Sequence, residues 1–354
     1  MVFDKSVSYP ANITISEDSD FLNRLTTISG FYRVLCKSAM GGGEVFVCRL
    51  KDNDSNFYFD GSPADLTGPE GDVMVVLLEF WYKWYKVDDN KFLYHFADHN
   101  IDGTYIHVPR SLVGAYKGYV SLNRLYSWSG VSPTTSKSFN DFKSYAKARG
   151  TGYQMIDFQQ HCVIAMMSYA KYKTRNLEYV LGSGGATYDP ATVTGDSNAT
   201  GGADTKNESS KYVCGLGIEG VFGGIYEWVE GVEINNHVWK ITDPDGSTRN
   251  VKAGTSNGWI KNIAAENGPF FDIVPTSVGK IEAKNYSDYY FQNSYTGTYV
   301  MSRSGYNSIT YNGVAFTAAN HDASYIDSFF GSRLAFRGTI SEVVPEQFKK
   351  LPVL

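Results

Sequence analysis

Residues 285–338 read NYSDYYFQNSYTGTYVMSRSGYNSITYNGVAFTAANHDASYIDSFFGSRLAFRG. Between Asn285 and Phe330 this stretch contains no Lys and no Glu, although 19% of the chain is charged. The stretch is instead rich in Tyr, Ser, Asn, Thr, Gly and Ala, which is the composition of a paratope. Tyr gives stiff amphipathic contact area, and Ser, Asn and Gly give adaptable hydrogen bonds. The final eight residues, GSRLAFRG, mix apolar residues with Arg, as a buried closing strand does.

Two interpretations of this stretch are open. Tyr and Thr favour β-strands, so the same residues would suit an ordinary antiparallel sheet. The absence of Lys and Glu favours a binding surface, because both are depleted at interfaces. On the second interpretation the residues at its start bind ligand from a solvent-exposed surface. These residues are Tyr286, Ser287, Tyr289 and Tyr290.

The bulk composition limits the fold and the function. The chain has 354 residues, 35 of them Gly, and is 15% aromatic, with sparse helical patterning. These features predict an α+β fold with many short strands. A net charge of −5 without a Lys/Arg cluster argues against nucleic-acid binding. We expect neither a signal peptide nor membrane insertion, since no apolar run approaches about 18 residues.

The sequence predicts neither a metal site nor a cofactor. The four cysteines lack CxxC spacing and are predicted to be buried thiols; they are Cys36, Cys48, Cys162 and Cys214. A Gly-, Asn- and Asp-rich loop at 182–211 carries Asp189, Asp196 and Asp204 without the spacing of an EF-hand. We therefore expect a solvated loop rather than a calcium site.

Residues 1–67 are predicted to form a small N-terminal attachment or docking module, and residues 68–354 a larger ligand-binding domain. Met74–Leu78 is apolar on both faces, as in a strand that is covered on both sides. Asp245-Gly246 predicts a hairpin turn. Asn312-Gly313 predicts a two-residue type I′ hairpin inside the Tyr-rich stretch.

Two helices are expected in the middle of the chain. Ser138 can cap the first, which carries Phe139, Phe142, Tyr145 and Ala146 on one face and stops at Gly150. Asp157 can cap the second, and Gln160 occupies the capping-box position. The apolar stripe expected on the second helix consists of Phe158, Cys162, Ala165, Met166 and Tyr169.

Several motifs resemble a known family. GIYEWVEGV and GSRLAFRG resemble the Trp-Glu-Trp segment and the closing strand of the formylglycine-generating-enzyme family, and the helix pair resembles the two helices of the same C-type lectin fold. Residues 68–340 also resemble phage tail or prophage proteins of gut bacteria. The enzymes need cysteines near the C-terminus, but the last one here is Cys214. The resemblance therefore implies the fold and not the enzyme.

In some members of this group the last stretch is the variable region of a diversity-generating retroelement, in which randomised adenines convert Asn codons into codons for other residues. The mixture of residue types here is similar to that product, so the resemblance implies that these positions bind ligand. They are Tyr306, Asn307, Ile309, Tyr311, His321, Tyr325, Asp327 and Phe329.

The resulting prediction is a C-type-lectin-like (formylglycine-generating-enzyme-like) α+β domain with a variable-type binding face at 285–330. Its function is to recognise a bacterial surface protein or glycan as a phage or prophage tail adhesin. The resemblance implies synthesis in the bacterial cytoplasm, a place in the virion, contacts with other tail proteins through the N-terminal module, and a homo-oligomer such as a homotrimer. Arg333 and Arg337 are expected to hold the closing strand.

Two alternatives stay open. One is a tail-associated glycan hydrolase that uses Glu227 or Glu230 with Asp288 or Asp322, because glycosidases need two carboxylates on either side of the bond that is cleaved. The other is a structural tail protein whose residues 285–330 are buried at subunit contacts.

Overall fold

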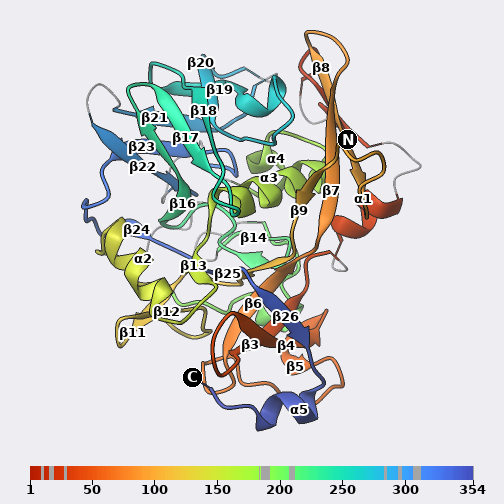
Figure 1. Ribbon diagram of the computed structural model, residues 1–354, viewed down its shortest axis with the longest axis vertical. Coiled ribbons are helices and arrows are strands. Elements are labelled where there is room, and N and C mark those ends of the chain that lie inside the picture. The colour runs from red at the N-terminus through yellow and green to blue at the C-terminus, as the bar shows by residue number, and fades with distance from the viewer. Residues whose placement is uncertain are drawn as a thin grey trace.

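The computed structural model describes residues 1–8, 12–15, 20–27, 30–182, 184, 192–206, 212–282, 285–293, 297–305 and 312–353. Within them the fold is mixed α+β with mostly antiparallel strands, as the composition predicts. Figure 1 shows one large sheet in the upper half, a second in the lower half, and helix α3 (Phe158–Tyr172) near the centre.

The upper sheet carries most of the Tyr-rich stretch. Among the described residues it has nine strands, and β21 and β23 are parallel neighbours. Their order is β18 (Thr248–Lys252), β17 (Val238–Thr242), β16 (Tyr226–Asn235), β22 (Thr298–Arg303), β23 (Thr317–His321), β21 (Tyr289–Gln292), β19 (Gly258–Ile263) and β20 (Pro275–Gly279), with β24 (Phe330–Gly331) paired to β16.

The lower sheet overturns the prediction of a separate N-terminal module. Strands from residues 33–58 pair directly with strands from the rest of the chain, so a boundary at 67/68 would divide one sheet and expose its core. The order is β13 (Tyr153–Met155), β25 (Leu334–Phe336), β10 (Ser111–Gly114), β6 (Asp72–Leu77), β3 (Arg33–Ser38), β4 (Glu44–Lys51) and β26 (Thr339–Glu342), with β5 (Asp54–Tyr58) paired to β4. Strand β6 is buried along its whole length, as predicted.

The first residues are also part of the main body. A smaller sheet has the order β2 (Ile13–Thr14), β1 (Val2–Asp4), β8 (Lys91–Ala97), β7 (Phe80–Lys86) and β9 (Ile106–Val108). The Met1 amino group is buried and donates a hydrogen bond to the Tyr94 carbonyl (2.9 Å). The remaining elements are the ribbons β11 (Tyr119–Ser121)–β12 (Arg124–Tyr126) and β14 (Cys214–Gly215)–β15 (Ile218–Glu219), helices α1 (Asp20–Leu25), α4 (Leu177–Leu181) and α5 (Pro345–Lys350), and the 3₁₀ turns η1 (Asn198–Thr200) and η2 (Ala264–Glu266).

The two predicted helices are confirmed with their caps. Helix α2 (Phe139–Lys147) begins after Ser138, whose hydroxyl accepts from the N–H of Asp141, and α3 begins after Asp157 in a capping box with Gln160. Helix α3 differs from the prediction in one respect. It is buried almost all around, not along one stripe, because sheet strands and loops pack on every side of it.

The two predicted hairpin turns have opposite outcomes. Residues 243–247 join β17 to β18, and Gly246 has a φ of +85°, so this hairpin is confirmed. The type I′ turn at Asn312-Gly313 is wrong. That turn needs a positive φ at both central residues, and Gly313 does not have one. Within the described residues, none of the helices has both the length and the apolar character needed to cross a membrane.

Candidate functional site

The two faces of the upper sheet have different surroundings. Strand alternation places Tyr290 on the inner face, where it is 0% exposed and its ring lies 5.9 Å from that of Trp239. Tyr289 and Phe291 lie on the outer face, are half-buried, and have ring centroids 4.5 Å apart. The inner face is closed by the core around α3, whereas the outer face reaches solvent.

A continuous series of aromatic contacts runs across the outer face. Trp259 on β19 contacts Tyr289 edge-on at 5.8 Å, and Phe291 lies 6.0 Å from the buried ring of Phe316. Phe316 in turn contacts Tyr226 at 5.7 Å. These contacts hold the outer rings in place, because each rests on a ring that is itself packed.

The series continues into the turn that follows β23. His321 and Tyr325 are stacked with centroids 3.6 Å apart, and both contact the buried ring of Phe330. Asp327 fixes this turn, since its carboxylate accepts from the Tyr325 hydroxyl (3.2 Å) and from the N–H of Phe329 (2.9 Å). We call the half-buried outer rings the aromatic face; they are Trp259, Tyr289, Phe291, His321, Tyr325 and Phe329.

Three of the predicted ligand-binding residues are wrong. Tyr286, Ser287 and Tyr290 are buried and offer no surface to a ligand. Tyr286 is 1% exposed, and its ring lies 6.1 Å from that of Tyr169 on α3. The physical reason is that residues 285–288 run beneath the sheet instead of over it, so their Tyr content builds core.

The other predicted positions divide into two groups. Tyr306, Asn307, Ile309 and Tyr311 lie outside the described residues. Tyr289, His321, Tyr325, Asp327 and Phe329 are half-buried and gather on the outer side of the sheet, around its middle strands and the turn after β23. Sequence reasoning missed Trp259 and Phe291. The strand alternation that separates Tyr289 from Tyr290 would have identified Phe291.

The ends of segment 306–311 are held together. Gly305 has a φ of +66°, and a Cβ there would overlap the side-chain oxygen of Asn312. The backbone N–H of Asn312 donates to Glu178 Oε1 (2.8 Å), and that of Ala315 donates to Asp288 Oδ2 (3.1 Å). Arg303 adds a bond from Nη1 to the Ala315 carbonyl (2.8 Å). We call Glu178, Asp288 and Arg303 the anchor, which the sequence analysis did not predict.

Burial controls the protonation of the two anchor carboxylates. Desolvation raises the pKa of Glu178 to about 8 and that of Asp288 to about 7. Each is also affected by its contacts: the negative charge of Asp288 raises the pKa of Glu178, while the N–H of Ala315 and the charge of Arg303 lower that of Asp288. Both carboxyls therefore titrate near neutral pH.

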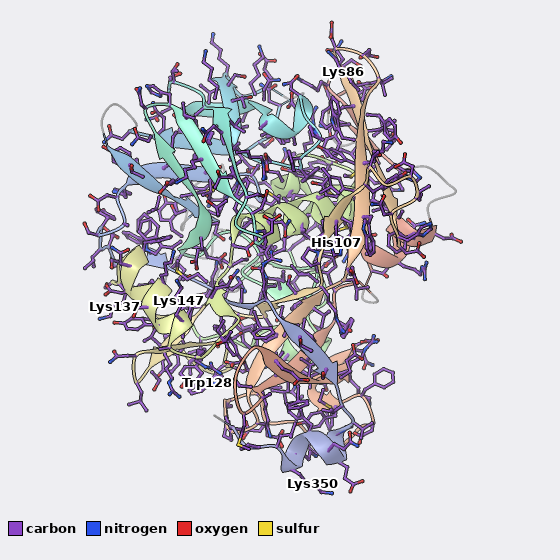
Figure 2. All side chains as sticks on the ribbon, viewed as in Figure 1. Lys86, His107, Trp128, Lys137, Lys147 and Lys350 are labelled. Carbon is purple, nitrogen blue, oxygen red and sulfur yellow. The ribbon has the colours of Figure 1, made fainter. Side chains whose placement is uncertain are left out.

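A polar groove lies beside the aromatic face. It has a volume of about 890 Å³, and α2 forms one wall; Figure 2 labels Lys137 and Lys147 at the two ends of this helix. Glu230, held by Lys143 at 2.9 Å, and Asp322 both line the groove. Two carboxylates of the hydrolase alternative are thus brought into one groove.

The other two carboxylates of that alternative are inaccessible. Glu227 is 1% exposed and pairs with Lys117 (3.0 Å) and Arg333 (2.8 Å). These cations outweigh its desolvation and lower its pKa to about 2. His161 Nε2 lies 3.5 Å from Glu227 and has no hydrogen-bond partner among the residues that the structure describes. Burial lowers the pKa of His161 to about 3, so the imidazole is neutral at pH 7. Asp288 is buried in the anchor.

Arg333 and Arg337 hold the closing strand, as predicted. Arg333 also donates to the carbonyls of Gly114, Glu219 and Gly220, and Arg337 donates to both carboxylate oxygens of Asp157. The four cysteines are buried and free, which confirms that prediction. Within the described residues, which include Asp196 and Asp204 but not Asp189, His, Cys, Asp and Glu form no group suited to a metal ion.

Comparison with known proteins adds no identification: no protein-family model matches the chain, and no curated protein matches it. The aromatic face, the groove and the anchor are therefore interpreted from their own chemistry.

Proposed function

We propose that this protein binds a molecule on a bacterial surface through the aromatic face, as the receptor-binding protein of a phage or prophage tail does. The observation that carries the proposal is the half-buried stack of His321 on Tyr325. Tyr325 packs against the buried ring of Phe330, and Asp327 fixes the turn that carries the stack. The fold that we propose for this scaffold is C-type-lectin-like.

The aromatic face suits binding because its rings need little ordering when a ligand arrives. Rotamer freedom is lost on binding at about 0.5–1.5 kcal/mol for each immobilised side chain, and rings that already rest on buried neighbours avoid much of this cost. Rings with a polar edge are also enriched among the residues that dominate binding energy. A ligand with apolar faces and hydroxyl or amide groups, such as a glycan or a protein loop, matches this surface.

The positions expected to vary support the same proposal. His321, Tyr325, Asp327 and Phe329 share one turn beside β23 and are half-buried, so changes there would alter the surface more than the core. We propose that a retroelement diversifies these positions. A near-copy of their coding segment that differs at adenines and lies beside a reverse transcriptase gene would support it.

The experiment compares Tyr325 in the aromatic face with an exposed tyrosine elsewhere on the surface. Labelled wild-type protein, Tyr325→Ala and the control Tyr85→Ala are incubated with a panel of gut bacterial strains and with their purified surface polysaccharides. Tyr85 is 40% exposed on β7, away from the aromatic face. We expect Tyr325→Ala to weaken binding about tenfold or more, since a central aromatic contributes over 1 kcal/mol, and Tyr85→Ala to bind normally.

Two results contradict the proposal. One is wild-type binding by Tyr325→Ala with the fold intact, and the other is absence of binding to every strain and polysaccharide tested. Because single contacts on a small face are weak, we also propose that the protein acts as a homo-oligomer that gains avidity. Sedimentation equilibrium of the full chain tests this second point.

Glycan hydrolysis at the groove is a second candidate, favoured by one observation: Glu230 and Asp322 line the same groove. A general acid needs a raised pKa, whereas hydrogen bonds from Ser324 lower the pKa of Asp322. Release of reducing sugar by the wild type that is lost in Glu230→Gln would support hydrolysis. No release by either protein would exclude it for the glycans tested.

A further inference from the structure

A second cavity adjoins the polar groove, with which it shares Asp243 and Pro244 in its lining. It opens between the β7–β9 pair, helix α3 and the turn that joins β17 to β18, and its volume is about 470 Å³. His107, which Figure 2 labels beside β7 and β9, lines it together with exposed residues such as Pro244. This volume is within the range of small-molecule sites in proteins.

The floor of the cavity is apolar and buried. Phe80 and Val108 come from the β7–β9 pair, Phe158, Val163 and Met166 come from one side of α3, and Phe271 follows η2. Cys162 also lines the cavity, and burial raises the pKa of its thiol to about 12, so it remains protonated and unreactive. The floor can therefore bury an apolar body without offering a nucleophile.

One wall of the cavity is charged. Arg249 donates from Nε to Asp272 Oδ2 (2.7 Å), pairs through its other nitrogens with Asp272 and Asp243, and lies 4.2 Å from the centroid of the Phe270 ring. The guanidinium is thus fully engaged. Arg249 contacts Asp243 through Oδ2, which leaves Oδ1 of that carboxylate for another partner.

The lining carries an excess of negative charge. Three carboxylates, Asp243, Asp245 and Asp272, face a single guanidinium. His107 is paired with Glu79 (2.6 Å), so this pair adds no net positive charge whichever protonation state the ring has. A half-buried excess of carboxylate next to an apolar floor attracts a cation that has an apolar body, because the cation gains both burial and charge pairing.

We infer that this cavity is a binding site for a small amphipathic cation, with an apolar body on the α3 floor and a protonated amine at Asp243. The amine would donate to Asp243 Oδ1 while Arg249 holds the other oxygen. The lining of this site contains none of the residues of the aromatic face, so the two proposals are tested separately.

The test uses 2-phenylethylammonium as the probe, with 2-phenylethanol and 3-phenylpropanoate as neutral and anionic probes of similar body. Methyl NMR of the full chain follows Met166 and Val163 during titration. We expect the ammonium probe to shift both methyl groups and to bind about tenfold more tightly than the alcohol, a difference of about 1.4 kcal/mol. The anionic probe is expected to bind least.

Three variants locate the site. Ile106→Trp places a larger ring at a half-buried position of the lining and should abolish the methyl shifts. Asp243→Asn keeps the shape and removes the charge, and should reduce the preference for ammonium over alcohol to less than about threefold. Asp89→Asn, an exposed carboxylate next to β7 that pairs with Lys86, should behave as the wild type.

Each opposite result overturns the inference. Equal binding of the three probes rules out recognition of charge, and unchanged affinity in Ile106→Trp places the probe elsewhere. Absence of any methyl shift up to millimolar probe excludes this ligand class. Near-UV circular dichroism of each variant shows whether the fold is kept, and Asp243→Asn, the least disruptive change, carries the conclusion if Ile106→Trp does not fold.

Discussion

Tyr289 and Tyr290 are neighbours in sequence and have opposite surroundings. Tyr290 is enclosed between the sheet and the core around α3, whereas Tyr289 packs in the aromatic face and reaches solvent. The same comparison holds for Glu227, buried among cations, and Glu230, which lines the groove three residues later. One sheet thus builds a buried core on its inner face and a partly exposed surface, which we propose binds ligand, on its outer face, using the same residue types.

The largest expected effect is on the inner face. Glu227→Gln leaves Lys117 and Arg333 as buried charges without a counter-charge, which costs about 5 kcal/mol of unfolding free energy. Glu230→Gln, on the same strand, should cost less than about 1 kcal/mol, because Glu230 is only partly buried. Urea unfolding of both variants measures the difference. Similar losses of unfolding free energy in the two variants would contradict the assignment of Glu227 to the buried face and of Glu230 to the exposed face.

The neighbouring tyrosines give the next largest difference. Tyr290→Ala removes a fully buried ring and should destabilise the protein by about 4 kcal/mol, as large-to-small core changes do. Tyr289→Ala should cost about 1 kcal/mol and should weaken ligand binding instead. Unfolding midpoints in guanidinium chloride test the first part. If Tyr289→Ala is the more damaging change, the assignment of the two faces is reversed.

The anchor makes stability depend on pH. Its carboxyls have folded pKa values above their unfolded values, so the folded state holds more protons. Stability is then fully present below about pH 4 and falls as pH rises through 7 and 8. Asp288→Asn, which mimics the protonated acid, should be neutral at about pH 4 and should stabilise by about 4 kcal/mol at about pH 8, since about three pKa units separate the folded and unfolded values. Urea unfolding at both pH values is the measurement, and an equal effect at the two would contradict this account.

The smallest expected effect sharpens the description of the inner face. The hydroxyl of Tyr290 is buried and has no hydrogen-bond partner among the described residues. Tyr290→Phe removes this unsatisfied group and keeps the ring, so it should leave stability unchanged or raise it by up to about 1 kcal/mol. A loss of more than about 1 kcal/mol in thermal unfolding would mean that the hydroxyl is satisfied.

Local chemistry in the sequence predicted several parts of the fold. The caps at Ser138 and Asp157 and the roles of Arg333 and Arg337 depend on short spacings or on a single charged side chain, and all are confirmed. The all-apolar pattern of β6 likewise predicted its burial. The caps could be predicted because residues three apart supply the whole interaction. For Arg333 and Arg337 only the need of a buried cation for partners could be predicted, since the partners Glu227 and Asp157 lie more than a hundred residues away.

Features that depend on contacts between residues far apart in the chain could not be predicted from the sequence. Composition marked 285–290 as binding surface, yet whether a Tyr faces solvent depends on which element lies over it, and for Tyr286 that element is α3, more than a hundred residues away. The pairing of β3 with β6 likewise contradicts the predicted separate N-terminal module, because the two strands lie on opposite sides of the predicted boundary at 67/68. The aromatic face was predicted in part, because its residues lie in the Tyr-rich stretch.

The contact between Gly305 and Asn312 has a consequence for how new specificities could arise. Gly305 and Asn312, which flank positions 306–311, are in contact, and backbone hydrogen bonds from Asn312 to Glu178 and from Ala315 to Asp288 hold this point in place. Six intervening positions can therefore change their side chains without moving their own end points. A library randomised at positions 306–311 would therefore keep the contacts of Gly305, Asn312 and Ala315 that hold its two flanks.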